Sequence, residues 1–143
     1  RRRRDARNPL RNDAGTTMMI GNFNAIDIDG AYAHPALTTT EETLLEVIAD
    51  DTQIMMAPIN ISARNLTVTT TFRLYMKVDG TNYDLKMGTG AIGGTIVWTP
   101  GDPAWVQFAV NGIFDHDFKV TIQSGAIGEL SPVDVTYSYN GAR

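Results

Sequence analysis

Residues 66–78 read LTVTTTFRLYMKV, a stretch in which two kinds of side chain alternate without interruption. One set of alternate positions holds Leu, Val, Thr, Phe, Leu, Met and Val, and the other holds Thr, Thr, Thr, Arg, Tyr and Lys. A period of two with many β-branched and aromatic residues is typical of a strand that buries one face. We therefore predict one long strand over residues 66–78, with its second face toward solvent or a partner.

A turn signal and a second alternating stretch follow this strand directly. Asp79-Gly80 is a strong hairpin signal, and the alternation resumes over residues 83–87. Because Thr81-Asn82 is also compatible with a turn, we expect a hairpin whose loop is longer than the shortest type. This hairpin is expected at the centre of the fold.

Shorter stretches with the composition of strands lie on both sides of the hairpin. They are residues 43–49, 53–62, 95–98, 105–110, 118–122 and 133–139. With the two strands of the hairpin, these six stretches amount to about eight strands, separated by turn signals roughly every 8–12 residues. This pattern predicts an all-β fold: a single antiparallel β-sandwich, jelly-roll-like, over residues 41–143, preceded by an extended basic N-terminal arm over residues 1–40.

The length and composition fit one globular domain without cysteine chemistry. The chain has 143 residues, of which 43% are hydrophobic, enough for a domain with its own core. The absence of cysteine excludes disulfides, thiolate metal sites and cysteine nucleophiles. No apolar run approaches the roughly 18 residues that a membrane-spanning helix needs, so we expect no membrane partner.

Charge is divided sharply between the first eleven residues and the rest of the chain. Six arginines and Asp5 give the first segment +5, whereas six basic and fifteen acidic residues give the other 132 residues −9, for a net charge of −4. The arginines are Arg1, Arg2, Arg3, Arg4, Arg7 and Arg11. We predict that they form a partner-binding arm. It could bridge acidic surfaces of neighbouring copies, neutralise about six phosphates of a nucleic acid, or be a remnant of processing.

Patterns typical of catalysis and metal binding are incomplete. No serine stands in a Gly-x-Ser-x-Gly elbow, and the glycine-rich residues 88–94 lack the Gly-Lys-Ser/Thr ending of a phosphate-binding loop. Asp115-His116-Asp117 places carboxylates beside a histidine, but adjacent strand residues point to opposite faces and a zinc site needs more ligands. We therefore predict a polar turn there, no metal, no cofactor and no enzymatic activity.

Trp98 and Trp105 flank the turn at Pro100-Gly101 and are open to two interpretations. Exposed aromatic rings stack on sugar rings in lectin-like modules, which makes both residues possible glycan contacts. Alternatively, both indoles seal the edge of the sandwich.

Several segments resemble small structural proteins of tailed phages and related viruses. They are residues 40–47 (TEETLLEV), 72–83 (FRLYMKVDGTNY), 118–124 (FKVTIQS) and 133–139 (VDVTYSY). In that group a similar TExTLLEV run opens the domain, and a KxDGTNY hairpin and an FKxTxQS strand follow in the same order. The resemblance covers roughly residues 39–140 and leaves out the arm.

The resemblance implies a non-enzymatic virion structural protein, such as a capsid-associated, decoration or tail component, and it brings no catalytic residues. Together with the arm it predicts a homo-oligomer in the extracellular virus particle, whose arm crosses onto neighbouring subunits and other virion proteins. Two alternatives stay open. One is a carbohydrate-binding, receptor-recognising β-sandwich module, and the other is a coat protein whose arm contacts packaged nucleic acid.

Overall fold

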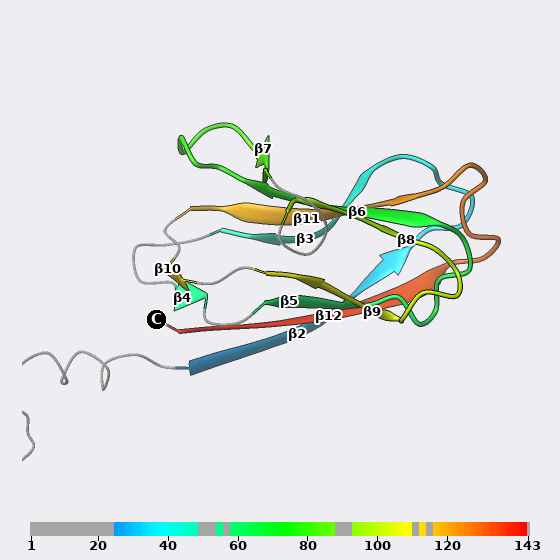
Figure 1. The fold of residues 1–143 in the computed structure, drawn as a ribbon, viewed down its shortest axis with the longest axis horizontal. Coiled ribbons are helices and arrows are strands. Elements are labelled where there is room, and N and C mark those ends of the chain that lie inside the picture. The colour runs from blue at the N-terminus through cyan, green and yellow to red at the C-terminus, as the bar shows by residue number, and fades with distance from the viewer. Residues whose placement is uncertain are drawn as a thin grey trace, which may run out of the picture.

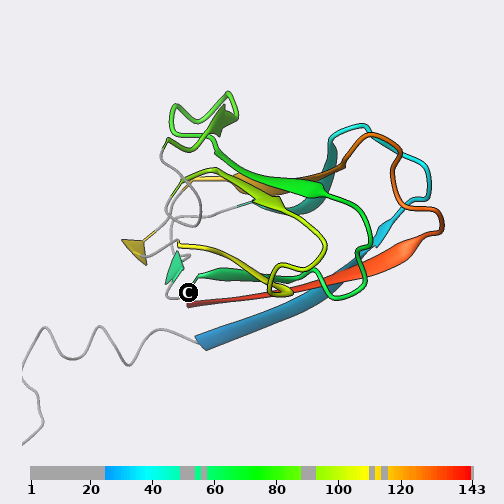
Figure 2. The same ribbon diagram turned by 45° about the vertical axis from the view of Figure 1, so that its right-hand side comes forward.

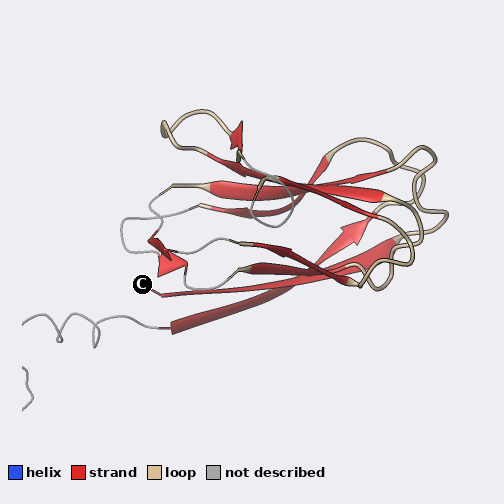
Figure 3. Ribbon diagram, in the orientation of Figure 1, coloured by secondary structure: helices blue, strands red, loops and turns tan. Residues whose placement is uncertain are grey.

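The structure is a computed structural model that describes residues 25–48, 54–55, 58–87, 93–109, 112–113 and 116–142. These residues form strands and loops (Figure 3), and they include no helix long and apolar enough to cross a membrane. The strands are β2 (Ala25–His34), β3 (Glu42–Val47), β4 (Ile54–Met55), β5 (Ile59–Ser62), β6 (Thr70–Met76), β7 (Asp84–Leu85), β8 (Thr95–Trp98), β9 (Trp105–Phe108), β10 (Gly112–Ile113), β11 (Phe118–Ser124) and β12 (Val133–Ala142).

The strands form two antiparallel sheets that lie over each other as two layers (Figure 1 and Figure 2). In the first sheet, β12 has β2 along one edge and both β4 and β5 along the other, with β10 and β9 outside them. In the second sheet, β11 lies between β3 and β6, and β7 and β8 pair with the remaining edge of β6.

Some short strands that follow each other in the chain occupy the same position in a sheet, and we count each such pair as one strand path. The pairs are β4 with β5, β7 with β8, and β9 with β10. Counted in this way, the described strands form eight paths, which run in the order first, eighth, third, sixth in one sheet and second, seventh, fourth, fifth in the other. This is the connectivity of an eight-stranded jelly roll. The predicted all-β, jelly-roll-like sandwich is therefore confirmed.

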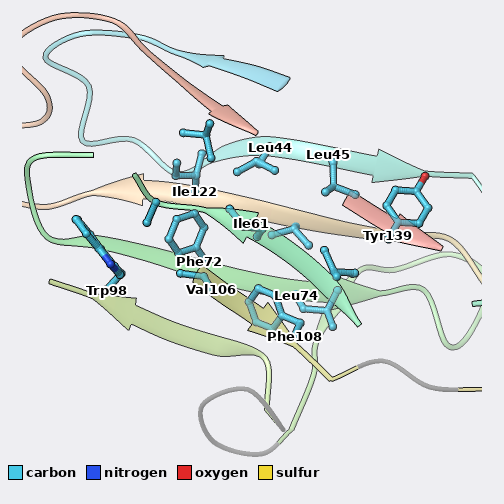
Figure 4. Packing of buried hydrophobic residues seen from close by; sticks show 14 of the residues in the cluster. Leu44, Leu45, Ile61, Phe72, Leu74, Trp98, Val106, Phe108, Ile122 and Tyr139 are labelled. Carbon is cyan, nitrogen blue, oxygen red and sulfur yellow. The ribbon is translucent and has the colours of Figure 1, made fainter. Parts of the chain in front are cut away.

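The core lies between the sheets and is built from alternate residues of both. Phe72 and Leu74 of β6 and Ile122 of β11 pack with Ile61 of β5 and Phe108 of β9 (Figure 4). Each of these side chains is at most 1% exposed. Because burial of one such side chain contributes about 1.5–3 kcal/mol, the alternation in the sequence accounts for much of the stability of the fold.

The strand predicted over residues 66–78 is shorter than expected. β6 covers only Thr70–Met76, although Leu66 upstream is also buried. The backbone N–H groups of Thr67 and Val68 donate to the carboxylate of Glu129 instead of to a neighbouring strand. The alternation correctly indicates the inward side chains of β6 and Leu66, but not Val78, which is 65% exposed. A ladder also needs a partner strand, and before Thr70 the side chain of Glu129 takes that place.

The hairpin after β6 is present, with a long loop. The Asp79 carboxylate accepts hydrogen bonds from the backbone N–H groups of Thr81 and Asn82, both at 2.8 Å, and Gly80 has a left-handed φ of 78°. β6 lies inside its sheet, whereas β7 is short and lies at the edge. Of the two strands of the predicted central hairpin, only the first, β6, therefore lies in the interior of a sheet.

The sandwich begins before residue 41, which was the boundary predicted from the sequence. β2 pairs with all ten residues of β12, so residues 25–34 belong to the first sheet and not to an arm. A glycine in mid-strand weakens the sequence signal. Gly30 is accommodated because the ring of Tyr137 covers it: a Cβ atom at residue 30 would lie 2.3 Å from the Tyr137 hydroxyl oxygen.

Candidate functional site

The six arginines of the predicted partner-binding arm lie outside the described residues, so this prediction is untested by the structure. Within the described ranges, the first strand is β2, whose first residue Ala25 pairs with Ala142. This end lies opposite the loops that connect β2 to β3 and β11 to β12 (Figure 1). The end of the sandwich that carries these two loops is called the loop end. It is formed by residues 35–41, 63–69 and 125–132.

Glu129 joins three loops at the loop end. Its side chain is buried, and its carboxylate accepts hydrogen bonds from the backbone N–H groups of Thr67 at 2.9 Å and Val68 at 3.1 Å and from the Thr67 hydroxyl at 2.7 Å. Its backbone carbonyl accepts a hydrogen bond from the N–H of Leu37 at 2.7 Å. Because a buried carboxylate needs such donors, Glu129 fixes the three loops relative to one another.

Three large apolar side chains are exposed on two of these loops. Leu37, Ile127 and Leu130 are 68%, 66% and 77% exposed, and we call them the loop-end patch. The backbone beneath them is tightly packed, since a Cβ atom at Gly128 would lie 2.7 Å from the carbonyl oxygen of Thr38. A rigid backbone lowers the entropy that a partner must overcome to bury these side chains.

A buried histidine and serine connect the two sheets beside the loop end. His34 Nε2 lies 2.7 Å from Ser124 Oγ, and both side chains are buried. Burial lowers the pKa of His34, and the negative charges of Glu42 and Glu129 offset part of this effect. A serine beside a neutral imidazole is an arrangement also found in nucleophilic catalysis. Since neither group is open to a substrate, we interpret the pair as structural.

The outer face of the second sheet carries a polar network around Glu41. The carboxylate accepts hydrogen bonds from the hydroxyls of Tyr75 at 2.7 Å and Thr121 at 2.5 Å, and it pairs with Arg73 at 3.1 Å. Burial opposes ionisation, but the hydrogen bonds from Thr121 and Tyr75, with the charges of Arg73 and Lys119, hold the pKa of Glu41 below its usual value. The network satisfies its own charges, so we interpret it as structural.

The two tryptophans lie in different environments. Trp98 is buried in the core, and its Nε1–H donates to the carbonyl oxygen of Pro103 at 3.1 Å. Trp105 is 67% exposed, and its Nε1–H donates to Asn60 Oδ1 at 2.9 Å. Both residues line one small hollow beside the turn, but Trp98 seals the sandwich, and of the two only Trp105 exposes most of its side chain to a ligand.

Trp105 borders a shallow depression of about 800 Å³ on the outer face of the first sheet. The depression extends over β2, β12, β5 and β9, and Arg64 also lines it. The sequence pattern alone does not reveal this surface, because its residues come from four strands that are distant in the chain.

The polar turn predicted at Asp115-His116-Asp117 is only partly described, since Asp115 lies outside the described residues. Asp117 pairs with Lys77 at 3.4 Å. Within the described ranges, no three histidine, aspartate or glutamate side chains are grouped as metal ligands would be.

Comparisons with protein-family models, curated proteins and solved structures find no match to this chain. The fold therefore defines the class of protein: an eight-stranded jelly-roll β-sandwich, with a basic leading segment on an acidic body.

Proposed function

We propose that this protein is a non-enzymatic structural component of a virus particle, capsid-associated, decorating or part of a tail, and that it assembles with copies of itself. The observation that carries the proposal is the jelly-roll connectivity. Double-sheet jelly rolls recur in viral capsid domains and in lectins. Because a fold hosts many functions, charge and exposed surface have to distinguish between them.

The charge distribution supports association between identical subunits. The first eleven residues carry +5 and the remainder −9, so each copy provides the electrostatic complement of the arm of another copy. Guanidinium–carboxylate pairs are the strongest contacts of this kind. In an assembly of many copies, weak individual contacts add up through multivalency.

The loop-end patch supports association at a second place. Leu37, Ile127 and Leu130 are exposed on fixed loops, and the start of β2 lies at the opposite end of the sandwich. Exposed large apolar side chains that lie close together often mark interaction surfaces. A subunit with different contact regions at its two ends can form head-to-tail interfaces, which generate rings or filaments.

The arm is tested by comparing the full chain with a variant that lacks residues 1–13. Light scattering after size-exclusion chromatography, and electron micrographs of the same samples, should show assemblies for the full chain and monomers for the truncated one. Replacement of the six arginines by lysine, which keeps the charge, should retain part of the assembly. Intact assemblies after truncation, or a full chain that stays monomeric at every concentration, would contradict the proposal.

The patch is tested by the double substitution Leu37→Asp and Leu130→Asp in the full chain. We expect weaker assembly with unchanged resistance to urea, because both side chains are already exposed. Leu85→Asp is the matched control, since Leu85 is 45% exposed on β7 of the second sheet. If Leu85→Asp weakened assembly equally, the loop-end patch would not be a specific part of the assembly interface.

The coat-protein alternative predicts a different result for the arm. If the arm contacts packaged nucleic acid, the full chain should be retained on DNA or RNA, and the truncated variant should not. This retention should fall steeply with salt, since about six phosphates would be neutralised.

A further inference from the structure

We propose that the outer face of the first sheet binds a neutral oligosaccharide, with the indole of Trp105 as its stacking surface. This inference goes beyond the structural role and does not depend on it. It is based on the orientation of the ring, on the polar side chains beside it, and on the charge of the surface.

The indole of Trp105 is held in one orientation although its ring is exposed. Its Nε1–H donates to Asn60 Oδ1 at 2.9 Å, and the same oxygen accepts a hydrogen bond from Gln107 Nε2 at 3.0 Å. A ligand that stacks on this ring therefore does not have to order it first, and such preorganisation increases affinity.

A continuous row of polar residues crosses the sheet next to the ring. In register, Asp29 lies opposite Ser138, Ser138 opposite Asn60, and Asn60 opposite Gln107, so the row includes all four strand paths. With neighbouring strands about 4.8 Å apart, the row is about 14 Å long. That length suits several linked sugar rings better than one.

Small side chains beside this row form the floor of the depression. Ser62 lies opposite Trp105, and Ala31 lies opposite Thr136, so small residues adjoin the large indole at the edge. The depression of about 800 Å³ follows from this difference in size. Hydroxyl groups both donate and accept hydrogen bonds, which matches the hydroxyls of a sugar, while the indole offers an apolar surface to the C–H face of its ring.

Charge favours a neutral ligand. Arg64 and Asp29 are the charged side chains among the described residues that line the depression, and their charges are opposite. Sites for single-stranded nucleic acid combine aromatic rings with a positively charged groove. The sequence beyond residue 11 instead carries −9, which repels polyanions.

The test uses the ¹⁵N-labelled full chain and nuclear magnetic resonance. The chain contains two tryptophans, so Trp98 in the core is an internal reference for Trp105 on the surface. Cellotriose, maltotriose and N-acetylated chitotriose are titrated separately into the millimolar range. We expect at least one of them to shift the indole N–H signal of Trp105 and to leave that of Trp98 in place.

Variants then assign the binding to the proposed surface. Binding by these variants is followed through the backbone amide signals, because the Trp105 variants lack the indole N–H. Trp105→Ala should weaken binding at least about tenfold, as the loss of one aromatic contact implies, and Trp105→Phe should weaken it less. Asn60→Ala should also weaken binding, because it releases the ring. Leu85→Ala, on the second sheet, should bind like the original protein.

Several results would overturn the proposal. They are the absence of a Trp105 shift with all three sugars, binding that survives Trp105→Ala, a Trp105 shift caused by an oligothymidine, and a shift caused by protein concentration alone. The last two would assign the surface to nucleic acid or to a second copy. None of these results depends on whether the arm supports assembly.

Discussion

His34 Nε2 lies 2.7 Å from Ser124 Oγ, so one buried hydrogen bond connects the last residue of β2 to the last residue of β11. The two strands belong to different sheets. Within the described part of the chain, β2 pairs with β12 alone. The hydrogen bond between His34 and Ser124 attaches the end of β2 to the opposite sheet. The bond therefore stabilises the end of β2, where the chain passes into the loop end.

We predict that this contact makes stability depend on pH. Burial lowers the pKa of His34 from its ordinary value of 6.5, partly offset by the charges of Glu42 and Glu129. Below pH 6.5 the unfolded chain takes up a proton that the folded protein still excludes, so stability falls as the pH decreases toward the folded pKa. Above pH 6.5 this contribution is fully present.

Urea unfolding at about pH 7.5 and about pH 5 measures the effect. The difference in unfolding free energy between the two pH values should be smaller for His34→Gln than for the original protein. The same difference in both proteins would show that His34 is not the responsible group.

Glu129→Ala should lower the free energy of unfolding by about 1–3 kcal/mol, because the N–H groups of Thr67 and Val68 lose their acceptor. Asp134→Ala, at an exposed position of β12, is the control and should change stability by less than about 0.5 kcal/mol. Amide hydrogen exchange should also become faster at Thr67 and Val68 in the first variant. Unchanged exchange there would contradict the assigned role.

Gly30→Ala should destabilise the protein by about 1–3 kcal/mol, because the new Cβ atom collides with the Tyr137 ring. The collision disappears when the ring is removed, so the same substitution should have little effect in a Tyr137→Ala background. A double-mutant cycle by urea unfolding measures this coupling. Additive effects would mean that the ring moves away without cost.

Tyr32 should resist ionisation in the folded protein. Burial, with a hydrogen bond to Glu42 and the charge of that carboxylate, raises its pKa to about 12. Stability from this group is present below pH 10 and is lost as the pH rises from 10 toward about 12, because the unfolded tyrosine ionises first. The pKa values of Tyr75 and Tyr83 are also raised by burial and by hydrogen bonds to Glu41 and Glu46. The absorbance of the phenolates should therefore show one late-titrating tyrosine fewer in Tyr32→Phe than in the original protein. A titration complete near pH 10 would refute the prediction.

Much of the fold was predictable because it depends on local patterns. Alternation indicated β6, β9 and β11, and Asp79-Gly80 indicated the turn after β6. The limits of strands were less predictable. The ladder of β6 starts at Thr70 because Glu129, distant in the sequence, occupies the backbone donors before it. β2 was missed because a glycine in mid-strand weakens the sequence signal. Gly30 is accommodated there because the ring of Tyr137, on another strand, covers it.

The candidate site was only partly predictable. Sequence reasoning selected both tryptophans, but their burial could not be known from their spacing around one turn. Trp98 and Trp105 are separated by the reversal of the chain at Gly101, whose φ is 105°, and they end in different sheets. The buried pair of His34 and Ser124 has no local signal at all, since 90 positions separate the two residues.

The sequence by itself determined the all-β class, the approximate number of strands, their inward faces and the division of charge, because each depends on neighbours in the chain. Tertiary structure decided which strands became partners, which tryptophan stayed exposed, and which carboxylate replaced a strand at the loop end. Those outcomes depend on contacts between distant residues, and such contacts exist only after the two sheets have closed around the core.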